Sequence, residues 1–63
     1  MKLRELRGVL HAKRVSFCFP ETKFGVDASG SSEIDRVITE NPDREVIHIG
    51  ELEHGALWVE LGR

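Results

Sequence analysis

The segment REVIHIGELEHGALWVEL, residues 44–61, decides the fold that the sequence predicts. Residues 46–49 are β-branched apart from one histidine, which is typical of a buried strand. Residues 56–61 alternate between aliphatic and other side chains, which indicates a second strand. Gly50 and Gly55 lie between the two runs and favour a turn. The segment therefore predicts an antiparallel hairpin.

The connection HIGELEHG, residues 48–55, places His48, Glu51, Glu53 and His54 close together in sequence. A helical zinc motif needs two histidines four residues apart, whereas these are six apart and flanked by glycines. On one continuous strand, the two imidazoles would be about 20 Å apart. They would meet only if the connection folded back as a compact loop. We therefore expect no metal here, and a hairpin tip with solvated acidic groups.

The segment before the hairpin has a helical pattern. Ile34, Val37 and Ile38 are spaced as on one face of a helix, and Asn41-Pro42 ends it. This predicts a short helix at about 33–40. The preceding glycine- and serine-rich residues 27–32 are expected to form a mobile loop.

The N-terminal third predicts a helix followed by a strand. Leu3, Leu6 and Leu10 form an apolar stripe at helical spacing within residues 1–13. Residues 15–19 alternate with an aromatic inner face, and Pro20 ends that strand or confines it to an edge. A short strand around residues 24–26 is expected to pair back on it.

These elements predict one α+β domain over residues 1–63. It is a small, mostly antiparallel sheet of three or four strands, packed on an N-terminal helix, with the second short helix at about 33–40. Val46 is an alternative core residue, because either face of its strand suits the interior. The expected core consists of Leu3, Leu6, Leu10, Val15, Phe17, Phe19, Ile34, Ile38, Ile47, Ile49, Leu57, Val59 and Leu61.

Length and composition narrow the classes of function. Cys18 is the single cysteine of 63 residues, so an internal disulfide is excluded. A chain of this size has little volume for a deep pocket, and it lacks a nucleophile, dinucleotide or phosphate-loop motif. We expect a non-enzymatic protein without a cofactor. No run approaches the length of a membrane span and no signal-peptide pattern occurs, so we expect a cytoplasmic protein.

The net charge of −2 conceals an asymmetry between the two halves of the chain. Residues 1–23 carry a net charge of +4, and residues 24–63 a net charge of −6. Either the halves present electrostatic surfaces to partners, or the folded chain mixes them. Candidate partner-binding residues in the acidic half are Glu33, Asp35, Glu40, Asp43, Glu45, Glu51 and Glu53. Candidate nucleic-acid-binding residues in the basic part are Lys2, Arg4, Arg7, Lys13 and Arg14.

The order of KLRELRGVL, RVSFCF, REVIHI and ALWVEL resembles that of small accessory proteins from phages and mobile elements. The resemblance spans most of the chain, although the serine-rich stretch 27–32 departs from it. It implies a compact α+β protein. Some members of that broad group, including anti-CRISPR proteins, block host defence complexes by binding them.

Three functional hypotheses follow. The first is a protein-binding accessory module, such as an inhibitor of a host nucleic-acid-handling complex like CRISPR-Cas, that acts through an acidic surface. The second is a small nucleic-acid-binding protein that uses the basic N-terminal helix, although the overall acidity opposes it. The third is a homodimer, which would cover an apolar sheet face around Trp58 and the phenylalanine-rich strand.

Overall fold

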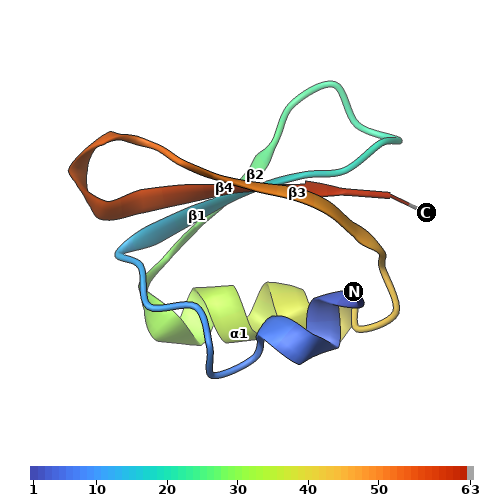
Figure 1. Cartoon of the computed structure of the whole chain (residues 1–63), viewed down its shortest axis with the longest axis horizontal. Helices are drawn as coiled ribbons and strands as arrows, with labels where there is room; N and C mark the ends of the chain where they lie inside the picture. The colour runs from blue at the N-terminus through green and yellow to red at the C-terminus, as the bar shows by residue number, and fades with distance from the viewer. Residues whose placement is uncertain (63) are drawn as a thin grey trace.

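The computed structural model describes residues 1–62 and contains a four-stranded sheet with one α-helix (Figure 1). The predicted α+β class is confirmed. In chain order the elements are η1 (Leu3–Leu6), β1 (Arg14–Cys18), β2 (Val26–Ser29), α1 (Gly30–Glu40), β3 (Val46–Glu51), η2 (Glu53–Gly55) and β4 (Ala56–Leu61).

The sheet is mixed, with strand order β2-β1-β4-β3. The predicted hairpin is present, because β3 and β4 pair antiparallel, and β1 and β2 also pair antiparallel. The central pair is parallel, with Val15 opposite Leu57 and Phe17 opposite Val59. Two of the three pairings are antiparallel, as the prediction of a mostly antiparallel sheet expects, and the central parallel pair makes the sheet mixed. Side-chain alternation has the same period in both kinds of pairing, so it carries no information on strand direction.

The predicted N-terminal helix is wrong. Only residues Leu3–Leu6 form a single 3₁₀ turn, and Gly8 has a φ of 76°, outside the helical region. The backbone is instead tied to the connection after α1, because the Leu3 amide donates to the Arg44 carbonyl at 2.8 Å. Lys2 forms an isolated bridge with Glu45. Short helices are marginal in water. The backbone of this segment is therefore stabilised more by its hydrogen bonds to the α1–β3 connection than it would be by hydrogen bonds within a helix.

The second predicted helix is confirmed and is the main helix of the protein. It begins at Gly30, directly after β2, so residues 27–32 form strand and helix rather than a loop. Glu33 closes the first turn, because its carboxylate accepts a hydrogen bond from the Ser29 amide at 2.9 Å. The β2 strand pairs back on β1 as expected, but over residues 26–29.

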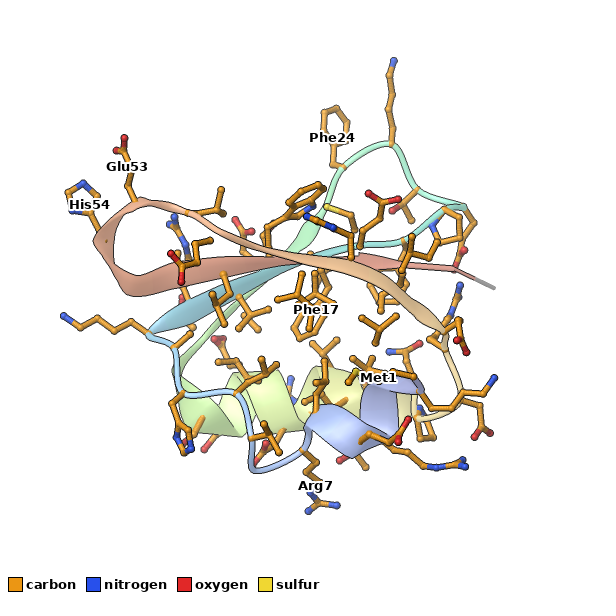
Figure 2. All side chains as sticks on the ribbon, viewed as in Figure 1. Met1, Arg7, Phe17, Phe24, Glu53 and His54 are labelled. Atoms are coloured by element: carbon orange, nitrogen blue, oxygen red, sulfur yellow. The ribbon has the colours of Figure 1, made fainter. Side chains whose placement is uncertain are left out.

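The core lies between the sheet and the layer formed by α1 and η1, which lie on the same side of the sheet (Figure 1). Phe17 points into this layer and is fully buried (Figure 2). Ala28 and Ala56 are buried but were not predicted as core residues. The confirmed buried core residues are Leu3, Leu6, Val15, Phe17, Ile34, Ile38, Val59 and Leu61, with Leu10, Phe19, Val46 and Leu57 partly buried against them.

Two predicted core residues are instead exposed. Ile47 is 59% exposed and Ile49 is 39% exposed. Both lie on β3, which is an edge strand. The main contacts of α1 are with η1 and with β1 and β2, the two strands farthest from β3 in the sheet. A single short helix is too small to cover all four strands, so β3 keeps an apolar sequence without a complete apolar environment.

Matched substitutions test this assignment of the core. Ile38, which is 1% exposed, should lose about 0.5–1.5 kcal/mol of unfolding free energy on substitution Ile38→Val. The same change at Ile47 removes a methylene that is hydrated in the folded protein. The unfolding free energy should therefore change by no more than about 0.5 kcal/mol. Urea unfolding followed by circular dichroism measures both. Equal losses at the two positions would contradict the burial described here.

Candidate functional site

Within residues 1–62, no helix covers the face of the sheet opposite α1 and η1, and the β1–β2 connection rises on that side (Figure 1). Strand alternation assigns side chains to it, because Val15, Phe17 and Val59 point into the core and their neighbours point the other way. We call this surface the outer face. It is formed by Ser16, Cys18, Asp27, His48, Gly50, Trp58 and Glu60, as the pairings between the strands place them.

Trp58 occupies the middle of the outer face on a central strand. Its indole nitrogen donates a hydrogen bond to the Cys18 sulfur at 2.9 Å. The His48 ring lies 5.2 Å from the indole, centroid to centroid, at a tilt of 55°. The indole is therefore held from both neighbouring strands, and its orientation is set before any partner arrives.

Gly50 leaves the space that the indole occupies. A Cβ atom added at Gly50 would lie 2.8 Å from Cε3 of Trp58, closer than side chains approach in proteins. Gly50 therefore has a packing role across the β3–β4 pair. Its sequence position predicted only a turn, and the cross-strand partner that requires it was not evident from the pattern.

The β1–β2 connection adds Phe24 to this surface. Phe24 is 81% exposed and stands on the outer side of the sheet (Figure 2). The Thr22 hydroxyl donates to the Phe24 carbonyl at 2.9 Å, and a Cβ atom at Gly25 would lie 3.0 Å from the Ser16 hydroxyl. The turn therefore packs against β1 and presents Phe24 outward.

The base of the same connection is anchored by Arg44. Its guanidinium forms a bidentate hydrogen-bonded ion pair with Glu21. The guanidinium carbon also lies 5.1 Å from the centre of the Phe19 ring. These contacts join the β1–β2 connection to the residues that precede β3. Phe24 is therefore exposed on a turn whose base is held in place by Arg44.

The charge of the outer face is negative. Asp27 is exposed on β2 and Glu60 is half-buried on β4, beside the pairing partner His48. The outer face as defined contains two carboxylates, and strand alternation also places Arg14 on this side at the start of β1, which leaves the carboxylates in excess. An indole flanked by carboxylates favours cationic groups, which interact with both the ring and the acids.

The seven predicted acidic residues fall on three separate parts of the molecule. Several are already engaged within the protein: Glu33 with the Ser29 amide, Asp43 with Arg4, and Glu45 with Lys2 and the amino terminus. They do not converge on one surface. The distribution is Glu33, Asp35 and Glu40 on α1, Asp43 and Glu45 in the α1–β3 connection, and Glu51 and Glu53 at the hairpin tip.

The five predicted basic residues are also dispersed. Lys2 and Arg4 form the ion pairs with Glu45 and Asp43, and Arg7 points away from the sheet (Figure 2). Lys13 and Arg14 lie at the start of β1, where the Lys13 amide donates to the Gly55 carbonyl at 3.1 Å. Without an N-terminal helix, no single element carries them.

The His/Glu cluster of residues 48–55 is divided by the hairpin. His48 lies against Trp58 on the outer face, whereas Glu53 and His54 project from the tip (Figure 2). Within residues 1–62, no group of three or more histidine, cysteine, aspartate or glutamate side chains is arranged to hold a metal ion. The predicted solvated tip agrees with the exposure of residues 51–55.

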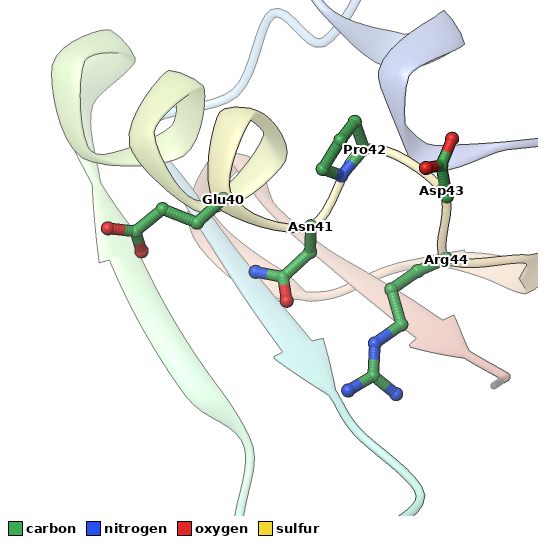
Figure 3. Close-up of a pocket in the computed structure, with 5 residues that line it drawn as sticks. All are labelled: Glu40, Asn41, Pro42, Asp43 and Arg44. Atoms are coloured by element: carbon green, nitrogen blue, oxygen red, sulfur yellow. The ribbon is translucent and has the colours of Figure 1, made fainter.

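A hollow of about 340 Å³ lies at the α1–β3 connection and is lined by residues 40–44 (Figure 3). The side chains of Glu40, Asp43 and Arg44 point in different directions there (Figure 3). Asp43 and Arg44 are bound to Arg4 and Glu21 respectively. The charged groups of this hollow therefore do not face a common reacting atom.

Comparison with protein-family models, curated proteins and solved structures gave no match to the chain. In the part of the chain that the structure describes, no helix has the length and apolar character that a membrane crossing requires. The geometry of the outer face is therefore the basis for assigning a function.

The packing of Trp58 on Gly50 is testable through fluorescence, because the protein has one tryptophan. We expect Gly50→Ala to displace the indole, shift its emission, and lower the unfolding free energy by about 1–3 kcal/mol. Gly62→Ala is the matched control: its added methyl would meet the flexible end of Ile47 at 3.2 Å. Unchanged emission in Gly50→Ala would contradict the described contact.

The ion pairs of Glu45 should make the unfolding free energy depend on pH. Hydrogen bonds from the amino terminus and then from Lys2 hold the pKa of this carboxyl below its ordinary value of 4.5. The folded state thus binds the proton more weakly than the unfolded state. The stabilisation is complete above pH 4.5 and is lost as the pH falls through the lowered folded-state pKa.

Urea midpoints measured at pH 7 and pH 3 test this linkage. Glu45→Gln should be less stable than the parent at pH 7, and the difference should shrink at pH 3. Glu51→Gln, at the other end of β3, serves as the control and should change the midpoint little at pH 7. A difference for Glu45→Gln that stays constant with pH would exclude the ion pairs as its cause.

Proposed function

We propose that the protein is a non-enzymatic protein-binding module, and that its outer face binds a cationic surface of a partner protein. The single observation that supports this proposal is the position of Trp58, held at the centre of an uncovered sheet face by Cys18 and His48. Trp58 is half-buried, so part of its ordered ring remains open to a partner. Tryptophan is prominent among the residues that dominate binding energy at protein interfaces.

The energetic argument rests on preorganisation. An interface aromatic that must first be immobilised costs about 0.5–1.5 kcal/mol of binding free energy. The hydrogen bond from Trp58 to Cys18 and the seat on Gly50 reduce that cost. Phe24 lies on the same side and offers a second exposed aromatic. Together they form an apolar centre with an acidic border.

The acidic border selects the chemistry of the partner. Asp27 and Glu60 oppose phosphate groups and attract lysine and arginine side chains. An arginine of the partner would stack on the Trp58 ring and pair with Glu60. Because acidic groups repel phosphate, we favour a protein partner over a nucleic acid. The basic residues of the N-terminal part also offer no nucleic-acid surface, because they are dispersed or paired with acidic residues.

The resemblance to small phage and mobile-element proteins extends this proposal. A cationic protein surface that binds nucleic acid, such as the channel of a CRISPR-Cas complex, matches the chemistry of the outer face. Occupation of such a channel would block its nucleic-acid ligand without any catalytic step. The proposed activity is therefore competitive inhibition at a basic surface.

Matched truncations of two exposed apolar residues test the binding surface. Phe24→Ser removes an aromatic group from the outer side, and Val9→Ser removes a 61% exposed side chain near η1 as a control. Tagged forms are applied to nuclease-treated lysate of cells that carry the gene, and bound proteins are quantified by mass spectrometry. We expect a protein with a basic surface to be retained by the parent and by Val9→Ser, and to be reduced at least about tenfold by Phe24→Ser.

The purified partner then provides a direct readout, because its binding should change the emission of Trp58. Equal retention by Phe24→Ser and the parent, or binding that leaves the emission unchanged, would exclude the outer face. Retention that occurs only in a parallel lysate without nuclease treatment would favour the nucleic-acid hypothesis instead.

A further inference from the structure

The two edges of the sheet differ in how well they are protected. At one edge, β2 has only four residues, carries Asp27, and continues directly into α1. At the other edge, β3 has six residues with the sequence VIHIGE, which contains neither lysine nor proline. Natural sheets use short edges, charged side chains and proline to prevent pairing with other chains. The β3 edge lacks most of these devices.

The apolar side chains of this edge point to both sides of the sheet. Ile49 pairs with Val59 and so lies on the helix side, yet 39% of its surface is exposed. Ile47 is 59% exposed, and Leu52, just beyond the strand, is also exposed. Strands with apolar residues on both faces are typical of sheets in which both faces are covered. The composition of β3 therefore suits a strand whose exposed isoleucines are covered by a further apolar surface.

Part of the β3 edge is already paired within the chain. The Val46 amide donates to the Met1 carbonyl at 2.8 Å, and Lys2 bridges to Glu45. The irregularity between Val46 and His48 also lies at this end. Pairing with the N-terminal residues shows that the edge accepts an added strand. The remaining regular part, residues 48–51, is open beside it.

We propose that a second copy of this chain occupies the open part of β3, with the two β3 strands antiparallel about a two-fold axis. The resulting sheet would have eight strands. Pairing of residues 48–51 in this way places Ile49 of each copy near the centre of the interface, and Ile47 opposite Leu52 of the other copy at each end. The proposal uses the edge of the sheet and is independent of the function assigned to the outer face.

Antiparallel pairing keeps like charges apart along the edge. The two Glu51 carboxylates lie at opposite ends of the interface. Each approaches the start of the other β3, where the amino terminus and Lys2 are balanced by the carboxylates of Glu45 and Glu5. Stacking of two outer faces would instead oppose Asp27 and Glu60 with their own copies.

The size of the interface indicates a weak dimer. Stable interfaces bury about 800 Å² on each partner, which would be nearly a fifth of the 4357 Å² surface of this chain. A short strand pair with its isoleucine contacts buries less. We therefore expect a monomer–dimer equilibrium with a dissociation constant in the micromolar range.

Sedimentation velocity on the full chain, from about 5 to about 500 µM, tests the proposal by mass action. We expect the parent to change from monomer to dimer over this range. Ile47→Lys places a charge at the edge and should shift the equilibrium at least tenfold toward monomer. Val9→Lys places the same charge on a residue of similar exposure outside the sheet and should leave the equilibrium unchanged.

Amide hydrogen exchange locates the interface. Protection of residues 47–51 should increase with protein concentration, whereas protection of residues 26–29 should not. A monomer at every concentration would overturn the proposal, as would a dimer that persists in Ile47→Lys. A dimer lost in Phe24→Ser but retained in Ile47→Lys would place self-association on the outer face. Capture of a partner protein that depends on Phe24 bears only on the proposed function.

Discussion

The structure depends on the contact between one face of a four-stranded sheet and a single layer made of α1 and η1. Phe17, Ile38 and Leu3 are fully buried in that layer and join β1 to both elements. The elements within residues 1–62 form no second layer. In this part of the chain, the other face of the sheet and most of the edge at β3 are therefore exposed.

The outer face shows how a small protein orders residues that lie outside its core. Trp58 is fixed by a thiol from β1, an imidazole from β3 and the absence of a side chain at Gly50. Each contact crosses a strand boundary, so the pairing of the sheet itself determines the position of the indole. A binding surface made in this way needs neither a deep pocket nor a separate scaffold.

The sequence predicted those elements in which local pattern and tertiary environment agree. The β3–β4 hairpin and the helix that ends before Pro42 were identified correctly, as was the inner face of β1. The leucine stripe of the N-terminus was misleading, because the same leucines are buried by a single 3₁₀ turn held by tertiary hydrogen bonds. Ile47 and Ile49 were misplaced because strand order cannot be read from hydrophobicity.

The candidate site was less predictable than the fold. Alternation placed Trp58 on the face opposite Val59, but its contacts with Cys18 and Gly50 join residues distant in sequence or across a turn. The charge asymmetry between the halves of the chain was real but did not produce two surfaces. Ion pairs such as Arg4–Asp43 and Lys2–Glu45 join the halves and partly neutralise them.

The central parallel pair has a consequence for the folding rate. β4 follows β3 in the chain yet lies between β1 and β3, and it pairs with a strand about forty residues earlier, as in Arg14 opposite Ala56. Until β4 is in place, β1 lacks one of its two neighbours and the sheet cannot close. The folding rate is therefore limited by long-range chain closure more than by formation of α1.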